Sequence, residues 1–183
     1  YNVSFGYQDE EGFTPGNDLR KINFGLGLNS PITDKLSVRS SFAFINTDVA
    51  TPPLNPGFGS NSNAGIPSVF ANVLYTPRNV DLANLPFEHP VDRSSVYYRG
   101  GNDIVNPIWA TKYYSNTSVV SRFFNSTSFN YDISKNFGLV YRVGLDTYTE
   151  NQEIKLNKGG GAGVSAIVNS GYFQSTTIKN TIW

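Results

Sequence analysis

The feature that most constrains this chain is the stretch RFFNSTSFNYDISKNFGLVYRVGLDTYTE, from Arg122 to Glu150, in which nearly every second residue is apolar. The alternation stops at a polar break over 132–136 and then resumes. A β-strand directs successive side chains to opposite faces, so a period of two separates an apolar face from a polar one. The stretch therefore predicts two long strands, joined by a short turn, with one apolar and one polar face.

Other segments carry the same signal. KINFGLGLN and KLSVRSSFAFI alternate cleanly, a weaker strand lies near the N-terminus, and another lies near the C-terminus without a fixed phase. The pattern predicts an all-β chain of about six antiparallel strands with almost no helix. The expected strands cover residues 2–8, 19–29, 35–46, 116–133, 137–149 and 172–183.

The connections between these strands alternate between short and long. SPITD joins the second strand to the third and SKN joins the fourth to the fifth, whereas residues 47–112 separate the third from the fourth. Transmembrane β-barrels have short turns at the periplasmic rim and longer loops at the extracellular rim. A barrel strand needs about 9–11 residues to cross the membrane, and the mean soluble strand has only about 5–6. The pattern therefore favours a segment of a large transmembrane barrel.

A soluble or surface-bound carbohydrate-binding β-sandwich is the alternative, because its strands also alternate between two faces. The charges favour the barrel, since a charge facing lipid at mid-bilayer costs about 2–4 kcal/mol. Only Arg20, near a strand start, departs from the polar face. The candidates for a lumen-facing position are Lys21, Arg39, Arg122, Arg142 and Asp146. The candidates for a lipid-facing position are Ile22, Phe24, Leu26, Phe42, Phe44, Phe123, Phe129, Tyr141 and Val143.

Six strands cannot close a barrel by themselves. The smallest bacterial barrels have about eight strands, and an open sheet edge in lipid leaves backbone groups unpaired at a cost of several kcal/mol each. The chain also begins directly in an expected strand, without Met or a signal peptide. We therefore expect an internal piece of a longer protein.

Composition argues against several other functions. Lys plus Arg and Asp plus Glu both number 14, and a chain with no net charge lacks the basic surface of a nucleic-acid binder. The absence of Cys and the single His89 exclude thiolate and multi-histidine metal sites, and His89 has no nucleophile motif beside it. A transmembrane helix needs a run of about 18 apolar residues, and the sequence contains no such run. We expect neither an enzyme nor a cofactor.

Five segments, in this order, resemble the SusC/RagA family of TonB-dependent outer-membrane transporters of Bacteroidota. The segments are GYQDEEGF, RKINFGLGLNSPITDKLSVRSSFAFINTD, VFANVLYTPRNVDL, NPIWATKY and RFFNSTSFNYDISKNFGLVYRVGLDTYTE. The resemblance extends over nearly the whole chain. The order of the segments is more specific than any one of them.

The resemblance implies an outer-membrane barrel of about 22 strands with a plug inside it. It implies energised import of a large oligosaccharide or peptide, with a SusD-like surface lipoprotein over the mouth and the TonB complex contacting a region outside this chain. Contact with the lipid bilayer and lipopolysaccharide, and a dimer of transporter–lipoprotein pairs, would also fit the family. A barrel that exports protein stays open as a further alternative.

The long loop over 47–112 contains eight prolines, which fix φ and stiffen the chain. Within it, IPSVFANVLY has helical spacing and predicts a short helix. The loop fits a docking surface for a lid protein, a part of the substrate mouth, or a segment packed on itself over the rim. Tyr97, Tyr98 and Trp109 are candidate mouth aromatics, with Trp109 favoured as a loop anchor. Tyr113 and Tyr114 are expected in an interfacial aromatic girdle.

Two other motifs favour plain solvated loops. QDEEG places Asp9, Glu10 and Glu11 in an expected outer hairpin loop, and carboxylates there could bind Ca²⁺. The three residues lack the spaced ligand pattern of a defined calcium site, so we expect no metal. KGGGAG, at 158–163, lacks the Gly-Lys-Ser/Thr ending and the following helix of a phosphate-binding loop.

Overall fold

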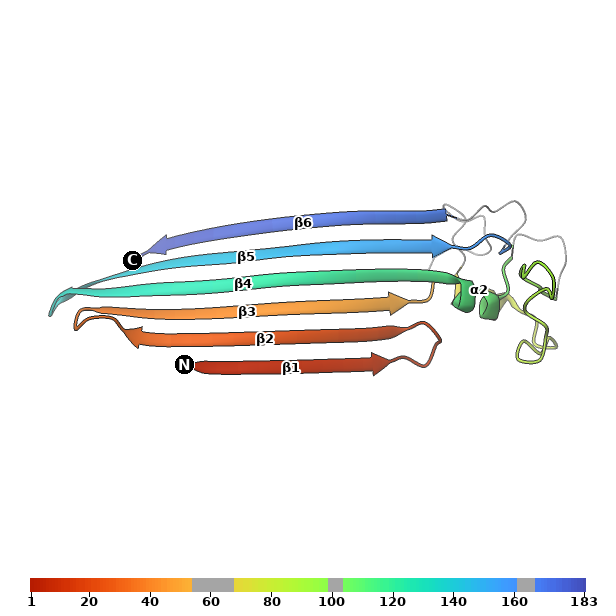
Figure 1. The fold of residues 1–183 in the computed structure, drawn as a ribbon, viewed down its shortest axis with the longest axis horizontal. Coiled ribbons are helices and arrows are strands. Elements are labelled where there is room, and N and C mark those ends of the chain that lie inside the picture. The colour runs from red at the N-terminus through yellow and green to blue at the C-terminus, as the bar shows by residue number, and fades with distance from the viewer. Residues whose placement is uncertain (54–67, 99–103, 161–166) are drawn as a thin grey trace.

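The computed structural model describes residues 1–53, 68–98, 104–160 and 167–183. Within these residues the chain is all-β, with six strands and two short helices, and each of the six expected strands is present. Figure 1 shows the strands side by side with the helices gathered at one end. In chain order the elements are β1 (Asn2–Glu11), β2 (Asp18–Pro31), β3 (Leu36–Thr51), α1 (Val69–Tyr75), α2 (Pro107–Tyr113), β4 (Tyr114–Ser134), β5 (Phe137–Leu156) and β6 (Ile167–Ile182).

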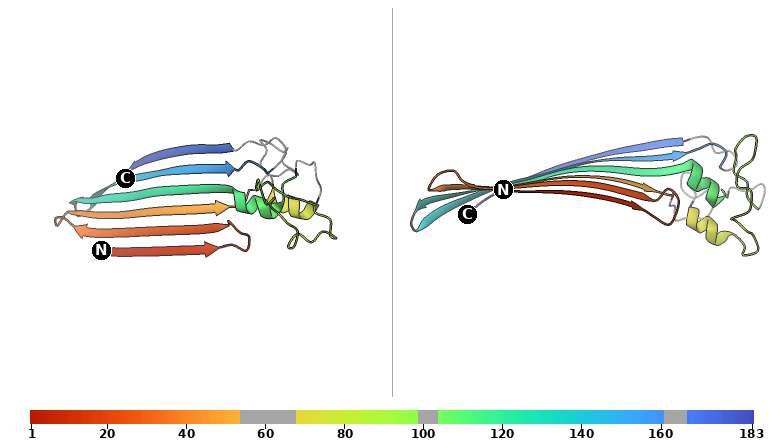
Figure 2. Two further views of the ribbon diagram at one scale, coloured as in Figure 1. Left: turned by 45° about the vertical axis from the view of Figure 1, so that its right-hand side comes forward. Right: turned by 60° about the horizontal axis from the view of Figure 1, so that its bottom comes forward.

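The strands form one open antiparallel sheet in the order β1-β2-β3-β4-β5-β6. Each strand therefore pairs with the next strand in the sequence. Figure 2 shows that the sheet is a single twisted layer. A sandwich needs a second sheet packed against the first, and the described part of the chain contains none. The sandwich alternative is thus not a fold that these residues form by themselves.

Several strands run further toward the long loop than the alternation predicts. β3 continues to Thr51 and pairs residue by residue with β4, and β6 begins at Ile167. The ladder continues because backbone hydrogen bonds do not require an apolar face. Asp9, Glu10 and Glu11 lie inside β1, so their expected placement in a hairpin loop was wrong.

The two short turns lie at the end of the sheet opposite the helices (Figure 1). In the β2–β3 turn, the hydroxyl of Thr33 accepts hydrogen bonds from the backbone N–H groups of Lys35 and Leu36. The β4–β5 turn follows a register shift between Asp132 and Ser134. Hydrogen bonds from a turn's backbone to its own side chain, such as those to Thr33, allow tight connections between long strands.

The two helices lie in the connection between β3 and β4. α1 confirms the helix expected in IPSVFANVLY, and its N-cap is Ser68, whose hydroxyl accepts from the Ala71 N–H at 3.2 Å. Pro67, which precedes this cap in the sequence, lies outside the described residues. α2 was not predicted from the sequence, although Asn106 is its N-cap and Pro107 occupies its first position. Among the described residues, no helix has the length and apolar character needed to cross a membrane.

The buried apolar residues lie at the loop end of the molecule and not along the sheet. The cluster consists of Val69, Val105, Trp109, Ala110, Tyr114 and Leu156. Along the strands, by contrast, large apolar side chains stay accessible, such as Phe5 at 71% and Ile178 at 64%. The middle of the sheet thus has no core on either face.

Candidate functional site

The strand register sorts the side chains onto two faces. Phe5 lies opposite Phe24, Phe24 opposite Phe44, and Phe44 opposite Phe123. Directly opposed residues project from the same face of a sheet. We call the face that carries Phe24 the apolar face and the opposite one, which carries Arg122, the polar face.

The strand register places all the candidates for a lipid-facing position on one face of the sheet and all those for a lumen-facing position on the other. The nine candidates for a lipid-facing position share the apolar face: Ile22, Phe24, Leu26, Phe42, Phe44, Phe123, Phe129, Tyr141 and Val143. The five candidates for a lumen-facing position share the polar face: Lys21, Arg39, Arg122, Arg142 and Asp146. What each face contacts remains a prediction.

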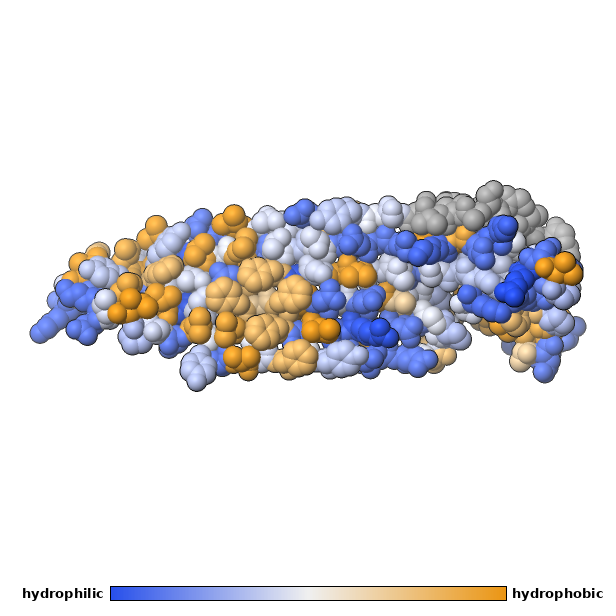
Figure 3. All heavy atoms as spheres, in the orientation of Figure 1, coloured by the Kyte–Doolittle hydropathy of each residue, from blue (hydrophilic) through white to orange (hydrophobic). Residues whose placement is uncertain are grey.

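Aromatic and aliphatic side chains form a band across the apolar face, and Figure 3 shows them gathered over the part of the sheet away from the helices. The Phe42 and Phe123 ring centroids are 6.4 Å apart, and Phe129 stacks on Tyr141 with centroids at 6.2 Å. Exposed aromatic surface of this extent is far larger than the scattered apolar residues of a soluble surface. A patch of this extent is typical of a surface that contacts a membrane or another protein.

The band runs obliquely across the strands. Toward the long loop, the last large apolar residue of the band is Tyr7 on β1 and Leu145 on β5. Following the register from Tyr7 through each strand leads to Thr149 on β5. Thr149 lies four residues beyond Leu145, so this limit of the band shifts on average by one residue for each of the four interstrand steps.

This shift corresponds to a definite strand tilt. One residue rises ~3.4 Å along a strand, and neighbouring strands are ~4.8 Å apart, so strands crossing a horizontal band would tilt by about 35°. Barrel strands tilt by about 35–45° from the barrel axis. The strand tilt of about 35° that the band implies therefore lies at the lower end of the range of barrel strands.

Charges on the apolar face occur only beyond the band, toward the long-loop end. Asp9, Arg20 and Asp48 form one row there, and Arg20 Nε lies 3.7 Å from Asp9 Oδ1. Asp18 and Glu11 form the next row. No group of residues in the described chain has the geometry of a metal site.

A small polar cluster interrupts the band on β3 and β4. The Ser40 and Thr127 hydroxyls are 2.6 Å apart, and Asn125 Nδ2 donates to the Ser41 carbonyl at 3.1 Å. Polar groups satisfied within the protein can face an apolar phase at little cost. The cluster is therefore compatible with an apolar environment.

The polar face carries mainly charged and small residues, with a few exposed aromatic ones, Phe124, Tyr148 and Phe173. Arg122 binds both oxygens of Asp146, at 2.9 and 2.6 Å. The Arg142 guanidinium lies 5.0 Å from the centroid of the Trp183 ring. Ser118 donates to Glu150 at 2.9 Å. Such a face suits contact with water or polar groups.

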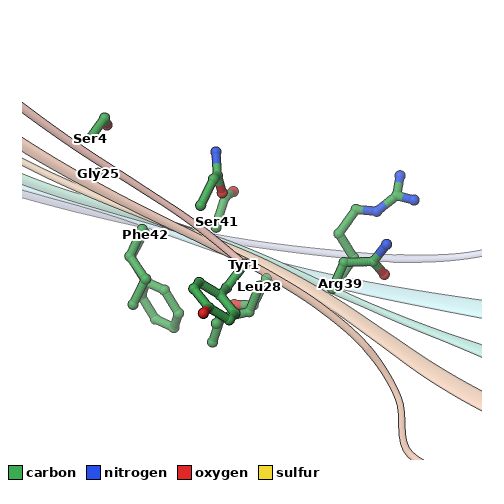
Figure 4. A pocket seen from close by; sticks show the side chains of 12 residues that line it. Tyr1, Ser4, Gly25, Leu28, Arg39, Ser41 and Phe42 are labelled. Atoms are coloured by element: carbon green, nitrogen blue, oxygen red, sulfur yellow. The ribbon is translucent and has the colours of Figure 1, made fainter.

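A shallow hollow lies along the short-turn halves of β1, β2 and β3. Figure 4 shows that its labelled residues come from both faces: Tyr1, Leu28 and Phe42 project to one side of the sheet, and Ser41 and Arg39 to the other. The hollow reflects the free edge of a single layer, so it does not by itself form a ligand site.

Residues 68–98 and 104–113 form a folded unit, which we call the loop module. Trp109 is completely buried in it, and its Nε1 donates to the Arg93 carbonyl at 2.8 Å. The rings of Tyr113 and Tyr114 pack against Trp109 at 4.8 and 5.2 Å. Trp109 is thus a loop anchor with no free face for a sugar. Tyr114 is buried in the loop core, so its expected place in an interfacial aromatic girdle was wrong, whereas Tyr113 packs against that core and stays partly exposed.

Tyr97 and Tyr98 remain partly exposed, with ring centroids 4.5 Å apart. The Tyr97 hydroxyl contacts Thr76 Oγ1 and donates to the Asn72 carbonyl at 3.1 Å. Burial raises the pKa of Tyr97 above its ordinary value. Tyr97 therefore holds α1 in place, and the Tyr97–Tyr98 pair still presents aromatic surface for a ligand.

Glu88 ties the middle of the loop module to α2. Lys112 Nζ of α2 donates to Glu88 Oε2 at 2.8 Å, and Arg93 Nε lies 3.6 Å from Oε1. The hydrogen bond from Lys112 holds the pKa of Glu88 below its ordinary value, and Glu88 in turn raises the pKa of Lys112. Sequence reasoning did not find this cluster, because its members are far apart in the chain and follow no motif.

The loop module packs on the polar-face side of the sheet end. Tyr114 and Leu156 are opposed on the polar face, at the long-loop ends of β4 and β5, and both are buried in the core around Trp109. From the β1–β2 turn, Phe13 places its ring 6.4 Å from that of Phe70 in α1. The module thus folds over the end of the polar face.

Comparisons of the chain with protein-family models, with curated proteins and with solved structures found no match.

Proposed function

We propose that this chain is part of the wall and outer loops of an outer-membrane β-barrel that imports a large nutrient, an oligosaccharide or a peptide. The observation that carries the proposal is the oblique apolar band on one face of a single antiparallel sheet whose other face is polar. In a membrane barrel the apolar face contacts lipid and the polar face lines an aqueous lumen.

The rest of the barrel would be supplied by strands outside this chain. β1 and β6 are the edges of the open sheet. An unpaired edge cannot lie in lipid, because no water is present to bond its backbone groups. The resemblance to SusC/RagA transporters fits this requirement, since that family would place six strands within a barrel of about 22.

The arrangement of loops supports import of something large. Both short turns lie at one end and the loop module at the other, as periplasmic and extracellular rims would be (Figure 1). A module folded over the lumen-side end of the wall is where an arriving cargo, or a SusD-like lipoprotein covering the mouth, would make contact. Energy would come from the TonB complex, acting through a region outside this chain.

The wall is tested by spin labels on two neighbouring residues of β3 in the full-length protein in lipid. Phe44→Cys places the label on the apolar face and Ile45→Cys places it on the polar face. We expect oxygen, which concentrates in lipid, to relax the label at 44 and an aqueous nickel complex to relax the label at 45. Preferential relaxation by nickel at position 44 would contradict a lipid-facing band.

Import is tested by uptake of fluorescent oligosaccharides and peptides into cells with and without the gene. We expect uptake of one class to require the protein and to stop when the proton gradient is dissipated. Protein-dependent uptake that persists without the gradient would contradict TonB-driven import while leaving the barrel intact.

A further inference from the structure

A short glycine-rich segment joins the connection after β5 to the loop module. Residues 157–160 follow the end of β5, and Gly160 is buried whereas the first two residues of the segment are exposed. The backbone N–H of Ser95, in the loop module, donates to the Gly159 carbonyl at 2.7 Å. Figure 1 shows the chain leaving β5 at the end of the sheet that carries the module. Two connections that are separate in the sequence therefore meet at residues 157–160, which we call the glycine strap.

Glycine is required at the last two positions of the strap. Gly159 has a φ of 92°, which residues with a side chain rarely adopt, and a Cβ there would lie 3.3 Å from Ser94 Cβ. A Cβ on Gly160 would collide with the Tyr114 hydroxyl and would lie 2.9 Å from Cζ3 of Trp109. The bare backbone of the strap therefore lies directly on the core around Trp109, and a side chain at position 160 would hold it away.

The strap is held weakly in this closed position. Its bond to Ser95 is the single hydrogen bond that joins residues 157–160 to another segment of the described chain. Such a bond favours the closed strap by only about two- to tenfold. The two glycines contribute no side chain to the apolar contact, and glycine regains more backbone freedom on release than any other residue.

A buried hydroxyl beneath the strap opposes closure. Tyr114 is 4% exposed, and its hydroxyl has no hydrogen-bond partner among the described residues. Gly160 lies against this hydroxyl, so lifting the strap would return the hydroxyl to water. A buried donor without an acceptor favours the open strap by about tenfold. Closure and opening are therefore nearly balanced.

We propose that the glycine strap is a latch between the two outer connections, and that it opens when a large cargo enters; the proposal rests on the import function proposed above. The loop module folds over the end of the polar face, where Tyr114 and Leu156 are buried in its core. Closed, the strap bridges the connection after β5 to the module at this end. Open, it leaves the core in place and separates the two connections, which widens the passage for a bulky solute.

Hydrogen exchange tests the latch in the full-length protein in lipid. The reporter is the Ser95 amide, which is protected while it donates to Gly159. Tyr114→Phe removes the unpartnered hydroxyl, and we expect it to slow exchange at Ser95 by about tenfold. Gly160→Ala adds the colliding Cβ and should speed exchange there, while the amides of β4 beyond the loop core stay protected in both variants.

The sign of the Tyr114→Phe effect separates a latch from ordinary packing. Loss of a buried group usually destabilises its surroundings, so a hydroxyl that only supports the core predicts faster exchange at Ser95 in this variant. Exchange that is faster or unchanged in Tyr114→Phe would overturn the proposal.

A disulfide lock links the latch to import. The separation of 3.3 Å from a Cβ at 159 to Ser94 Cβ is close to the roughly 3.5–4.5 Å between the Cβ atoms of a disulfide. The double variant Ser94→Cys/Gly159→Cys should therefore cross-link under oxidant with the strap closed. We expect the oxidised protein to take up cargo about tenfold more slowly than the same protein after reduction, because the passage cannot widen. Each single variant should be insensitive to the oxidant.

The outcomes distinguish the latch from the import function. Equal uptake by the oxidised and reduced forms would contradict the latch, since import would then proceed with the strap closed. Failure of the double variant to cross-link while the wall stays folded would contradict the closed contact. If the double variant does not fold, exchange at Ser95 in Tyr114→Phe still decides. If the wild type imports no cargo, the import proposal fails, and the same exchange measurement decides whether the strap opens.

Discussion

Arg122 and Asp146 join β4 to β5 through a two-point ion pair, in which Nε donates to Oδ1 at 2.9 Å and Nη2 to Oδ2 at 2.6 Å. The residue directly opposite Arg122 is Tyr148, so the pair runs diagonally across the two strands. A diagonal contact is sensitive to strand register, because a slip by one residue would carry one partner to the other face.

We expect Arg122→Gln to lower the thermal stability of the full-length barrel slightly, since both side chains are partly exposed and such pairs contribute little. A double-mutant cycle with Asp146→Asn should give a small favourable coupling that weakens as salt is added. The measurement is the melting temperature in detergent for the four proteins at two salt concentrations. Strict additivity at low salt would mean that the pair contributes nothing.

A lysine on the apolar face should impair folding into membranes. Phe42→Lys places a charge well inside the band, and we expect a loss of about 2–4 kcal/mol in folding into lipid vesicles. The neighbouring Ala43→Lys puts the same charge on the polar face and should cost far less. Urea titrations of folding, followed by the mobility shift of unheated protein on gels, give both values. Equal losses at the two positions would argue against a lipid-facing band.

Removing the anchor of the loop module should unfold the loop without unfolding the wall. Trp109 is fully buried, and loss of a buried tryptophan side chain costs about 3–5 kcal/mol. We expect Trp109→Ala to speed proteolysis within residues 68–113 while the strands stay protected, and Trp109→Phe to show a smaller effect. Hydrogen exchange resolved by mass spectrometry separates the two regions. An unchanged rate in the loop would show that Trp109 does not hold it.

Acid should loosen the loop module through Glu88. Its pKa in the folded loop lies below its value in the unfolded chain, chiefly because Lys112 donates to it. The stabilisation is therefore fully present above the unfolded pKa and is lost as the pH falls through the folded pKa. The NMR signal of the Trp109 indole proton, which bonds to Arg93, should broaden in that range.

The matched variant for this pH effect is Glu88→Gln. It should weaken the loop at neutral pH and flatten the response to acid. A smaller response should remain from Asp92, whose pKa is also lowered, by hydrogen bonds from Ser94. An acid response identical in Glu88→Gln and the wild type would assign the effect to other groups.

The strands could be predicted because their signal is local. Alternation in KINFGLGLN or KLSVRSSFAFI follows directly from the pleat, so the residues that share a face were grouped correctly before the register was known. The extension of β3 to Thr51 could not be predicted, because its last residues are held by pairing with β4 and not by their own pattern.

The loop module was predicted only in part. α1 has a helical period of its own, whereas the buried position of Tyr114 and the partly buried one of Tyr113 depend on contacts with Trp109, which no local pattern encodes. The slope of the band could not be predicted from the sequence, because it is defined only by how the apolar residues of one strand are placed relative to those of the next. For α2, the local signal was present at Asn106 and Pro107 but was not used.

The identity of strand order and chain order has a consequence for assembly. β1 to β3 and β4 to β6 can each form by successive pairing of neighbouring strands, which keeps most contacts local. The seam between β3 and β4 differs, because Thr51 and Asn116 become partners only after the chain between them has closed. The entropy of that closure is reduced once the core around Trp109 has formed. We therefore expect the loop to fold before the two three-stranded halves join, and to set how fast they do so.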